Sequence, residues 1–239
     1  MSCLSGGPEI ITDGLVLHYD AASSKSYTSG STTWRDLTIN GRNGTLINGP
    51  GYNTDAGGNI TFDGTNDYLS ASTFSSLLNY QSAGSIDVVF KILSTPTVDY
   101  VGVCGFNPDI DTRVFWLETA ELATDIVRLT WRLSSGGLGT RTTGIKPSTN
   151  RSINHVICTY EVASPNVTFT MYVNGSRLGA TTASGSLTNT PNTPFIIGVN
   201  GYGSYINANF YSAKIYNRAL SATEVLQNYN ETKTRFGLT

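Results

Sequence analysis

The acidic side chains of this chain do not form the pair that cleavage of a glycosidic bond requires. That chemistry needs two carboxyl groups about 5–9 Å apart on one face, one of them kept protonated by its surroundings. Glu118 and Glu121 are three residues apart, which on a strand directs them to opposite faces. The two histidines, His18 and His155, lie in strand-like patterns without the Gly-x-Ser-x-Gly turn that presents a hydrolase nucleophile. We therefore predict that the protein is not an enzyme, with a glycanase or polysaccharide lyase as the alternative.

Oxygen-bearing side chains recur in two segments at spacings that could hold a hard cation. Calcium takes carboxylate, amide and carbonyl oxygens from loops. The two clusters are Asn107, Asp109 and Asp111, and Asp63, Asn66 and Asp67. In β-proteins the same residue types also form turns by accepting hydrogen bonds from the backbone. Calcium is thus the one cofactor that the sequence suggests, and turn formation is the competing interpretation of both clusters.

Aromatic side chains beside amide groups could bind a sugar. A ring can stack on the apolar face of a sugar while neighbouring polar groups hydrogen-bond its hydroxyls, and such sites commonly lie on loops. Tyr202, Tyr205 and Asn200 form the best such segment, which is rich in glycine. Tyr52 and Trp116 are further candidates. Ordinary packing in the protein interior is the competing interpretation for all of these rings.

The composition excludes several classes of partner. Only 13% of the 239 residues are charged and the formal net charge is -2, so Ser, Thr, Asn and Gly must supply most of the polar surface. Without a basic stripe to neutralise phosphates, we exclude nucleic acid as a main partner. Without a run of roughly 20 apolar residues, we exclude membrane insertion. The first residues lack the pattern of a signal peptide, so we expect synthesis in a host cytoplasm.

Short segments rich in Val, Ile, Thr, Tyr and Phe alternate with turn residues along the chain, which is typical of a β-sandwich. The clearest of these predicted strands are 15–19, 59–62, 67–71, 85–93, 113–117, 126–133, 152–160, 167–173 and 208–216. Within 85–93, Ile86, Val88 and Phe90 share one parity, whereas Asp87 and Lys91 share the other. This alternation predicts a strand with one face packed on a second sheet and the other face in water.

Two local motifs predict specific connections. Asn174-Gly175 stands between two strand-like segments and favours a tight hairpin, because both residues tolerate positive φ. Near the end of the chain, Ser221 and Glu224 have the spacing of a capping box and precede apolar residues at helical spacing. We therefore predict one antiparallel hairpin there and one short C-terminal helix.

The first twelve residues read as an extended arm ahead of a single domain over 13–239, since small residues and proline precede the first periodic segment. An arm of this kind could contact a partner. Its candidate contact residues are Met1, Cys3, Leu4, Pro8, Ile10 and Ile11.

Four blocks of sequence resemble a known family. In chain order they are GLVLHYDA at 14–21, TTWRDLTINGRNGTLINGP at 32–50, GGNITFDGTNDYLSAS at 57–72 and FYSAKIYNRALSATEVLQNYNETK at 210–233. Together they resemble the laminin-G-like, concanavalin-A-like jelly-roll family, in the version seen in bacteriophage structural proteins. The resemblance implies an all-β, antiparallel two-sheet jelly-roll sandwich in which the first and last strands pair. It does not imply one function, because this fold hosts lectins, glycanases, adhesion modules and virion components.

Two hypotheses of function follow. The first is a non-enzymatic bacteriophage virion protein, a capsid decoration protein on the head surface that attaches to other capsid or tail proteins through its arm and rim loops. Repetition over a shell would multiply weak contacts of this kind. The second is a carbohydrate-binding, lectin-type module of a tail fibre or adhesin that recognises host-surface glycans. Both place the chain on a virion surface and leave open whether it forms a homo-oligomer.

Overall fold

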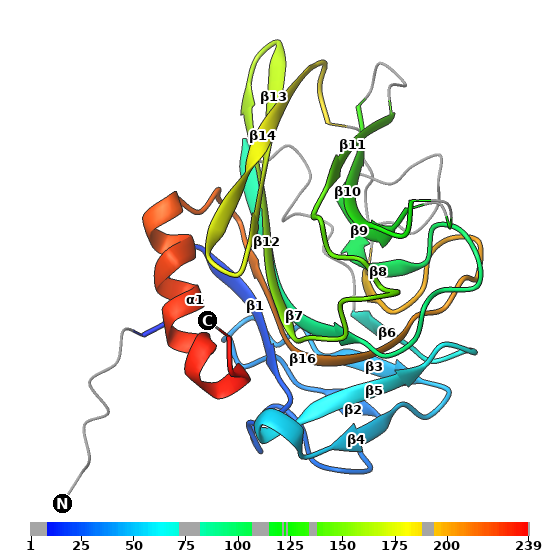
Figure 1. Cartoon of the computed structure of the whole chain (residues 1–239). Coiled ribbons are helices and arrows are strands. Elements are labelled where there is room, and N and C mark those ends of the chain that lie inside the picture. The colour runs from blue at the N-terminus through cyan, green and yellow to red at the C-terminus, as the bar shows by residue number, and fades with distance from the viewer. Residues whose placement is uncertain are drawn as a thin grey trace, which may run out of the picture.

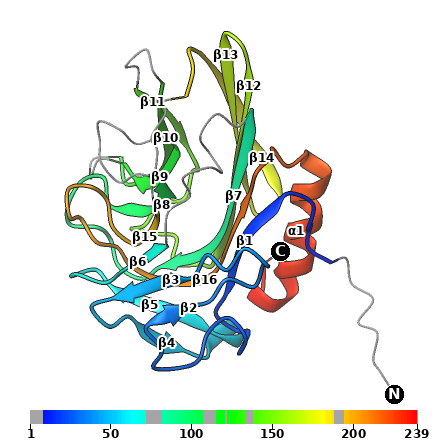
Figure 2. The ribbon, with the colours of Figure 1, turned by 180° about the vertical axis from the view of Figure 1, so that it is seen from behind.

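The computed structural model describes residues 9–71, 82–106, 115–120, 122, 124–133, 138–187 and 194–238. In this part of the chain two antiparallel sheets stack face to face, and a single α-helix lies outside them (Figures 1 and 2). The architecture is the predicted two-sheet jelly-roll sandwich with one C-terminal helix. That helix is not long and apolar enough to cross a membrane, and it is the only α-helix of the described residues.

Sheet A has the strand order β14-β13-β12-β7-β16-β5-β4, with β1 also paired to β16. Its strands are β1 (Leu15–Asp20), β4 (Gly51–Asn53), β5 (Asn59–Asp63), β7 (Ala83–Ile92), β12 (Asn154–Ala163), β13 (Asn166–Val173), β14 (Ser176–Ser184) and β16 (Asn207–Tyr216). The pairing of β1 with β16 confirms the predicted contact between the first and last strands, with Leu17 opposite Ile215.

Sheet B has the order β11-β10-β9-β8-β15-β6-β3-β2. Its strands are β2 (Thr33–Trp34), β3 (Gly44–Ile47), β6 (Tyr68–Ala71), β8 (Gly102–Phe106), β9 (Phe115–Thr119), β10 (Val127–Arg132), β11 (Leu138–Thr142) and β15 (Phe195–Ile197). A 3-10 turn, η1 (Asp55–Gly57), connects β4 and β5.

The main core lies between the sheets and follows the predicted period of two. Ile86, Val88 and Phe90 of β7 all point into it, as their shared parity requires. Across the core, the rings of Trp131 and Phe169 stack with centroids 4.1 Å apart. Each buried side chain of this size contributes roughly 1.5–3 kcal/mol relative to exposure. These residues therefore hold the two sheets together.

Both predicted local motifs are confirmed. Asn174 and Gly175 have φ values of 49° and 75° and connect β13 to β14 in an antiparallel hairpin. The helix α1 (Ala222–Phe236) begins at Ser221, whose side chain accepts a hydrogen bond from the backbone N–H of Glu224. The Glu224 side chain accepts in return from the N–H of Ser221. This capping box satisfies donors that the first turn of a helix leaves unpaired.

The prediction that the outer face of β7 lies in water is wrong. Helix α1 packs across the outer face of sheet A, beside β1, β16 and β12 (Figures 1 and 2). Phe236 of the helix contacts Val89 and Tyr211 there. Asp87, expected in solvent, is 0% exposed. The other predicted wet residue, Lys91, is partly buried.

Asp87 is the centre of a buried polar cluster between sheet A and α1. Its Oδ1 atom lies 2.9 Å from His155 Nε2 and 3.3 Å from Lys214 Nζ, and its Oδ2 atom accepts from Asn228 Nδ2 at 2.9 Å. Thr232 lies 3.4 Å from the other ring nitrogen of His155. Burial by itself would raise the pKa of Asp87, but Lys214, then His155 and Asn228, outweigh it and hold this pKa below its ordinary value. The carboxylate is therefore charged and fully partnered.

The segment before β1 also packs on α1. The backbone N–H of Ile11 donates to Asn228 Oδ1 at 2.8 Å, and the Tyr216 hydroxyl donates to the Ile11 carbonyl at 3.1 Å. Gln227 donates to the carbonyl of Glu9 at 2.7 Å. Residues 9 and 11, which belong to the predicted arm over 1–12, are therefore hydrogen-bonded to α1 and β16 of their own domain.

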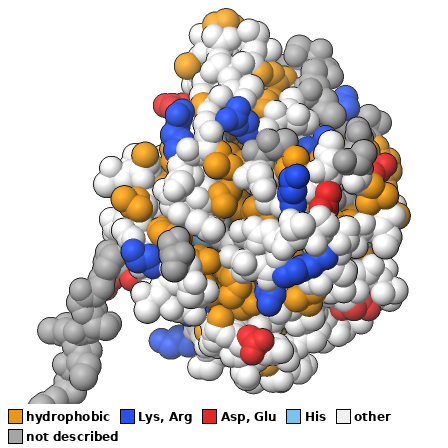
Figure 3. All heavy atoms as spheres, viewed as in Figure 1, with side chains coloured by type: hydrophobic (Ala, Val, Ile, Leu, Met, Phe, Trp, Pro, Cys, Tyr) orange, Lys and Arg blue, Asp and Glu red, His pale blue; other side chains and the backbone are white. Residues whose placement is uncertain are grey.

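Of the residues predicted to contact a partner, Ile10 and Ile11 thus lie in this tied, partly buried segment. The others are outside the described residues: Met1, Cys3, Leu4 and Pro8. The face of the molecule shown in Figure 3 carries its charged side chains scattered among uncharged ones, in keeping with the low charge content of the sequence.

Replacing Asp87 with Asn tests the role of the buried cluster. The amide keeps the shape of the side chain but leaves Lys214 without its counter-ion, so we expect the free energy of unfolding to fall by about 3–5 kcal/mol. Equilibrium unfolding in urea measures this change. Glu161→Gln, an exposed charge removal on neighbouring β12, is the matched control and should cost less than about 0.5 kcal/mol. Equal stability of Asp87→Asn and the unmodified protein would contradict the assigned role.

Candidate functional site

Three loops at one end of the sandwich enclose a hollow of about 450 Å³. They connect β5 to β6, β7 to β8 and β15 to β16, and the last is the orange loop on the right of Figure 1. The lining residues are 63–65, 94–98, 101 and 202–207. A volume of this size is within the range of small-molecule sites, roughly 300–1,000 Å³. We call this feature the loop hollow.

Tyr202 and Tyr205, the leading sugar-binding candidates of the sequence analysis, both line the loop hollow. Tyr202 is 57% exposed, so much of its ring is open to solvent. Tyr205 is held more firmly, because its ring packs beside Tyr68 with centroids 6.3 Å apart. One ring is therefore available for stacking and the other forms part of a fixed wall.

Asn200 does not line the hollow but holds the loop that carries both tyrosines. It is 4% exposed, and its Oδ1 atom accepts from the backbone N–H groups of Tyr202 at 3.0 Å and Ser204 at 2.9 Å. Its Nδ2 atom donates to the carbonyl of Tyr100, which ties this loop to the β7–β8 loop. Asn200 is thus a positioning residue, where the sequence analysis expected a direct contact with sugar.

Asp63 brings a carboxylate to the loop hollow. Its Oδ1 atom accepts from the backbone N–H groups of Thr65 at 2.7 Å and Asn66 at 3.3 Å. These hydrogen bonds, the one from Thr65 first, lower the pKa of Asp63, so the group is ionised at neutral pH. Asp67 is buried and accepts from the N–H of Asp63 at 3.2 Å. Turn formation therefore accounts for the observed contacts of this cluster.

The structure does not test the calcium prediction directly, because Asn side chains and backbone carbonyls, as well as carboxylates, can bind this ion. No group of three or more His, Cys, Asp or Glu side chains in the described residues gathers in a way that could hold a metal ion. The second predicted cluster, Asn107, Asp109 and Asp111, lies outside the described residues.

Two further aromatic candidates lie away from the loop hollow. Trp116 is 1% exposed and packs with Ile196 and Val199 beneath the β15–β16 loop, so its ring has no open face to offer a sugar. This burial corrects the expectation that Trp116 contacts a ligand directly. Tyr52, on the short edge strand β4, packs against Tyr27 with ring centroids 5.2 Å apart.

Sequence reasoning missed the β7–β8 loop, which lines one side of the hollow with Ser94, Thr95 and Thr97 around Pro96 and with the half-exposed Val98. Pro96 is a turn signal, but nothing local in the sequence indicates that this loop meets the β15–β16 loop. Hydroxyl groups, an ionised carboxylate and an exposed ring thus share one hollow. These are the groups that bind a polar ligand with an apolar face.

Comparison with solved structures finds several with the same fold. A Trypanosoma rangeli sialidase in complex with sialic acid aligns with a TM-score of 0.67 at 16% identity, over 95% of this chain and 34% of that one. The binding domain of Paraclostridial Mosquitocidal Protein 1 aligns with a TM-score of 0.69 at 16% identity, over 91% of this chain and 52% of that one. The receptor binding domain of botulinum neurotoxin C/D mosaic serotype gives 0.71 at 11% identity, over 92% and 52%.

At these identities the similarity shows a shared fold, found both in an enzyme and in binding domains. The chain spans about a third to about half of the length of the structures compared. A comparison with curated proteins finds no match.

The fold and the loop hollow together define a lectin-like jelly-roll module. A family model described as the concanavalin A-like lectin/glucanases superfamily matches residues 63–226, and the chain belongs to this family. The match confirms the resemblance at the level of this superfamily, and it includes every residue that lines the loop hollow. The blocks at 14–21 and 32–50 lie outside the matched residues.

Asn200→Ala tests how the tyrosine loop is held. Loss of the amide leaves the backbone N–H groups of Tyr202 and Ser204 without their acceptor, so these two amide hydrogens should exchange with solvent at least about tenfold faster. The free energy of unfolding should fall by about 1–2 kcal/mol. Hydrogen exchange followed by NMR measures the first effect. Amides in β12, far from this loop, serve as the internal control, and unchanged exchange at Tyr202 and Ser204 would contradict the anchoring role.

Proposed function

We propose that this chain is a non-catalytic carbohydrate-binding module that holds a glycan in the loop hollow. The observation that carries the proposal is the exposed ring of Tyr202 on the wall of a hollow that the Asp63 carboxylate and several hydroxyl-bearing side chains also line. A sugar ring would stack on Tyr202, while its hydroxyls would donate to Asp63 and exchange hydrogen bonds with Thr65 and Ser204.

The same lining supports binding without catalysis. Among the described residues that line the loop hollow, Asp63 is the single carboxylate. Its pKa is lowered, whereas a general acid for glycoside cleavage needs a raised pKa. Cleavage by the usual mechanism also needs a second carboxyl group on the other side of the bond. The arrangement therefore favours a binding module over a glycanase.

The similar structures are consistent with this proposal. One similar fold belongs to a sialidase in complex with sialic acid and another to the receptor binding domain of a botulinum neurotoxin. Those ligands and receptors belong to those proteins. What transfers to the present chain is that this fold can carry a recognition site on its loops.

The sequence blocks favour a further placement of this module, on the surface of a bacteriophage virion. Four blocks in the order found in phage structural proteins run from residue 14 to residue 233. On this proposal the chain is made in the host cytoplasm and bound to capsid or tail proteins, either as a head decoration or as part of a fibre. Glycan binding and virion attachment are compatible, because the loop hollow occupies only one end of the molecule.

Tyr202→Ala tests glycan binding. We expect the variant to lose about five- to thirtyfold in affinity for whichever glycan the unmodified protein selects, because stacking of a sugar on one aromatic ring contributes on the order of 1–2 kcal/mol. A glycan array identifies the glycan and calorimetry measures its affinity. Tyr202→Phe keeps the ring and is the matched control, expected to bind within about threefold of the unmodified protein. An array without any selective binding would refute the proposal.

Virion placement has its own test. Antibodies raised against the purified chain should label intact phage particles in immunogold electron microscopy. Repeated labelling of the head would indicate a decoration protein, and labelling of the tail would indicate a fibre. Particles lacking the gene for this chain are the control. Absence of the chain from purified particles would remove the virion proposal and leave the glycan-binding proposal intact.

A further inference from the structure

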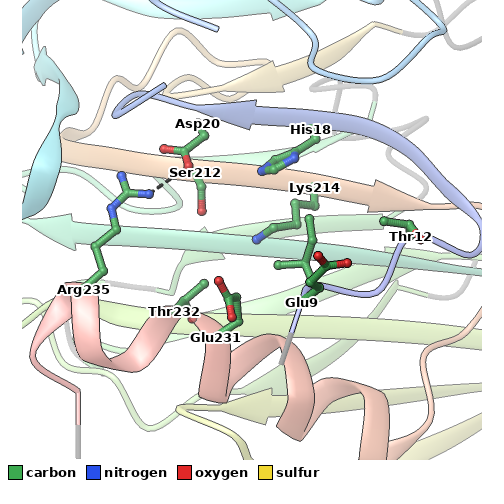
Figure 4. A pocket seen from close by; sticks show the side chains of 10 residues that line it. Glu9, Thr12, His18, Asp20, Ser212, Lys214, Glu231, Thr232 and Arg235 are labelled. Carbon is green, nitrogen blue, oxygen red and sulfur yellow. Dashed lines mark hydrogen bonds and ion pairs between the residues drawn. The ribbon is translucent and has the colours of Figure 1, made fainter. Parts of the chain in front are cut away.

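A second cavity, of about 340 Å³, lies between helix α1, strands β1 and β16, and the segment before β1 (Figure 4). It shares no lining residue with the loop hollow. We call it the sub-helix cavity. Nine of its ten lining residues have polar side chains, Ile10 being the exception, whereas helices normally pack on sheets through apolar side chains.

The floor of the sub-helix cavity comes from two cross-strand pairs. His18 of β1 lies opposite Lys214 of β16, and Asp20 lies opposite Ser212. Alternation along each strand places all four side chains on the face turned toward α1. Figure 4 shows Arg235 reaching from the helix toward Asp20 and Ser212.

The acidic groups nearest the floor already have partners. Asp20 Oδ2 accepts from Arg235 Nη1 at 2.8 Å, and Asp20 Oδ1 accepts from the backbone N–H of Ala22 at 2.9 Å. Behind the floor, both oxygens of Asp87 are engaged, one of them by Lys214. These carboxylates therefore balance the charges of Arg235 and Lys214 but offer little further hydrogen-bonding capacity.

Two buried donors that line the cavity, one on this floor and one on α1, lack acceptors among the described residues. Ser212 is 3% exposed, and its buried Oγ atom has no hydrogen-bond partner in the described part of the chain. The same holds for Arg235 Nη2. Lys214 uses one of its three N–H donors on Asp87. Buried donors without acceptors are costly, so Ser212 Oγ and Arg235 Nη2 mark a corner of the cavity whose hydrogen-bonding capacity the described residues leave unused.

The opposite side of the cavity has the reverse character. The carboxylates of Glu9 and Glu231 face the space across from Lys214 (Figure 4). They would repel a simple anion but accept hydrogen bonds from hydroxyl or amino groups. Burial, and then Lys214, lowers the pKa of His18 to about 4, so His18 adds no charge at neutral pH.

We propose that the sub-helix cavity binds a small carboxylic acid that also carries hydroxyl or amino groups, the chemistry shared by sugar acids and amino acids. The ligand carboxylate would accept from Ser212 Oγ, Arg235 Nη2 and Lys214 Nζ. Its hydroxyl or amino groups would donate to Glu231 and Glu9. The volume of the cavity fits a molecule the size of one monosaccharide or one amino acid.

Calorimetric titration with four probes tests this ligand class. Sodium D-glucuronate represents sugar acids and L-serine represents amino acids, whereas acetate lacks the donor groups and D-glucose lacks the carboxylate. We expect glucuronate, L-serine or both to bind saturably, at least about tenfold more tightly than acetate and D-glucose. Whichever of the two binds identifies the source of the carboxylate.

Variants at Ser212 place the ligand in the cavity. Ser212→Glu builds a carboxylate into the chain at the same corner, so it should abolish ligand binding. Ser212→Ala keeps the space but removes the hydroxyl, so affinity should fall about tenfold. Ser212→Ala is the smaller of the two changes, so its affinity shows whether the ligand lies in this cavity if Ser212→Glu does not fold. Tyr202→Ala, in the loop hollow, is the control and should leave this binding unchanged.

Several results would overturn the proposal. One is the absence of saturable binding by either glucuronate or L-serine. Another is acetate binding as tightly as the larger probes, which would indicate a simple anion site. Binding that survives both Ser212 variants, or that Tyr202→Ala removes, would place the ligand elsewhere. Because the two cavities have separate lining residues, glycan binding in the loop hollow succeeds or fails independently of this result.

Discussion

The burial of β16 on both faces is the constraint on which the rest of this structure depends. Nine of its ten residues are buried, so the strand needs the inter-sheet core on one side and helix α1 on the other. Phe210 and Ile215 enter the core, whereas Ser212 and Lys214 face the helix. The same strand begins at the loop hollow, where Asn207 forms part of the lining. A change in its register by one residue would exchange the two faces and disrupt both cavities.

The helix is held on the sheet by apolar contacts at its ends and by a polar cluster in its middle. Val225 and Phe236 pack on apolar neighbours, while Asn228 bonds to the buried carboxylate of Asp87. A buried ion pair adds little stability over an apolar equivalent, but removing one partner is costly. Its hydrogen bonds connect α1 to β7, through Asn228 and Asp87, in the observed orientation. The sub-helix cavity is open to polar ligands because this interface is polar.

The two cavities illustrate how one fold carries different kinds of site. The loop hollow presents an exposed ring on connecting segments, which can vary without disturbing the sheets. The sub-helix cavity is formed by paired strands and a helix, which fix its side chains more rigidly. Similar folds occur in a sialidase and in toxin binding domains, so the architecture alone does not select a function. The side chains at each cavity must carry that argument.

Local spacing in the sequence determined the longer strands such as β7, β12 and β16, the Asn174-Gly175 hairpin and the capped helix, because each depends on neighbours a few residues apart. The strands β2, β3, β4, β8, β11 and β15 were not predicted. It also determined which side chains of β7 share a face. Tertiary structure alone decided that the second face, with Asp87, is covered, since the covering helix begins more than 130 residues later. In the same way, the β15–β16 loop buries Trp116 and leaves Tyr202 exposed. The alternation along a strand fixes the face of the sheet to which each side chain points. Whether that face is buried depends on which distant segment of the chain packs against it.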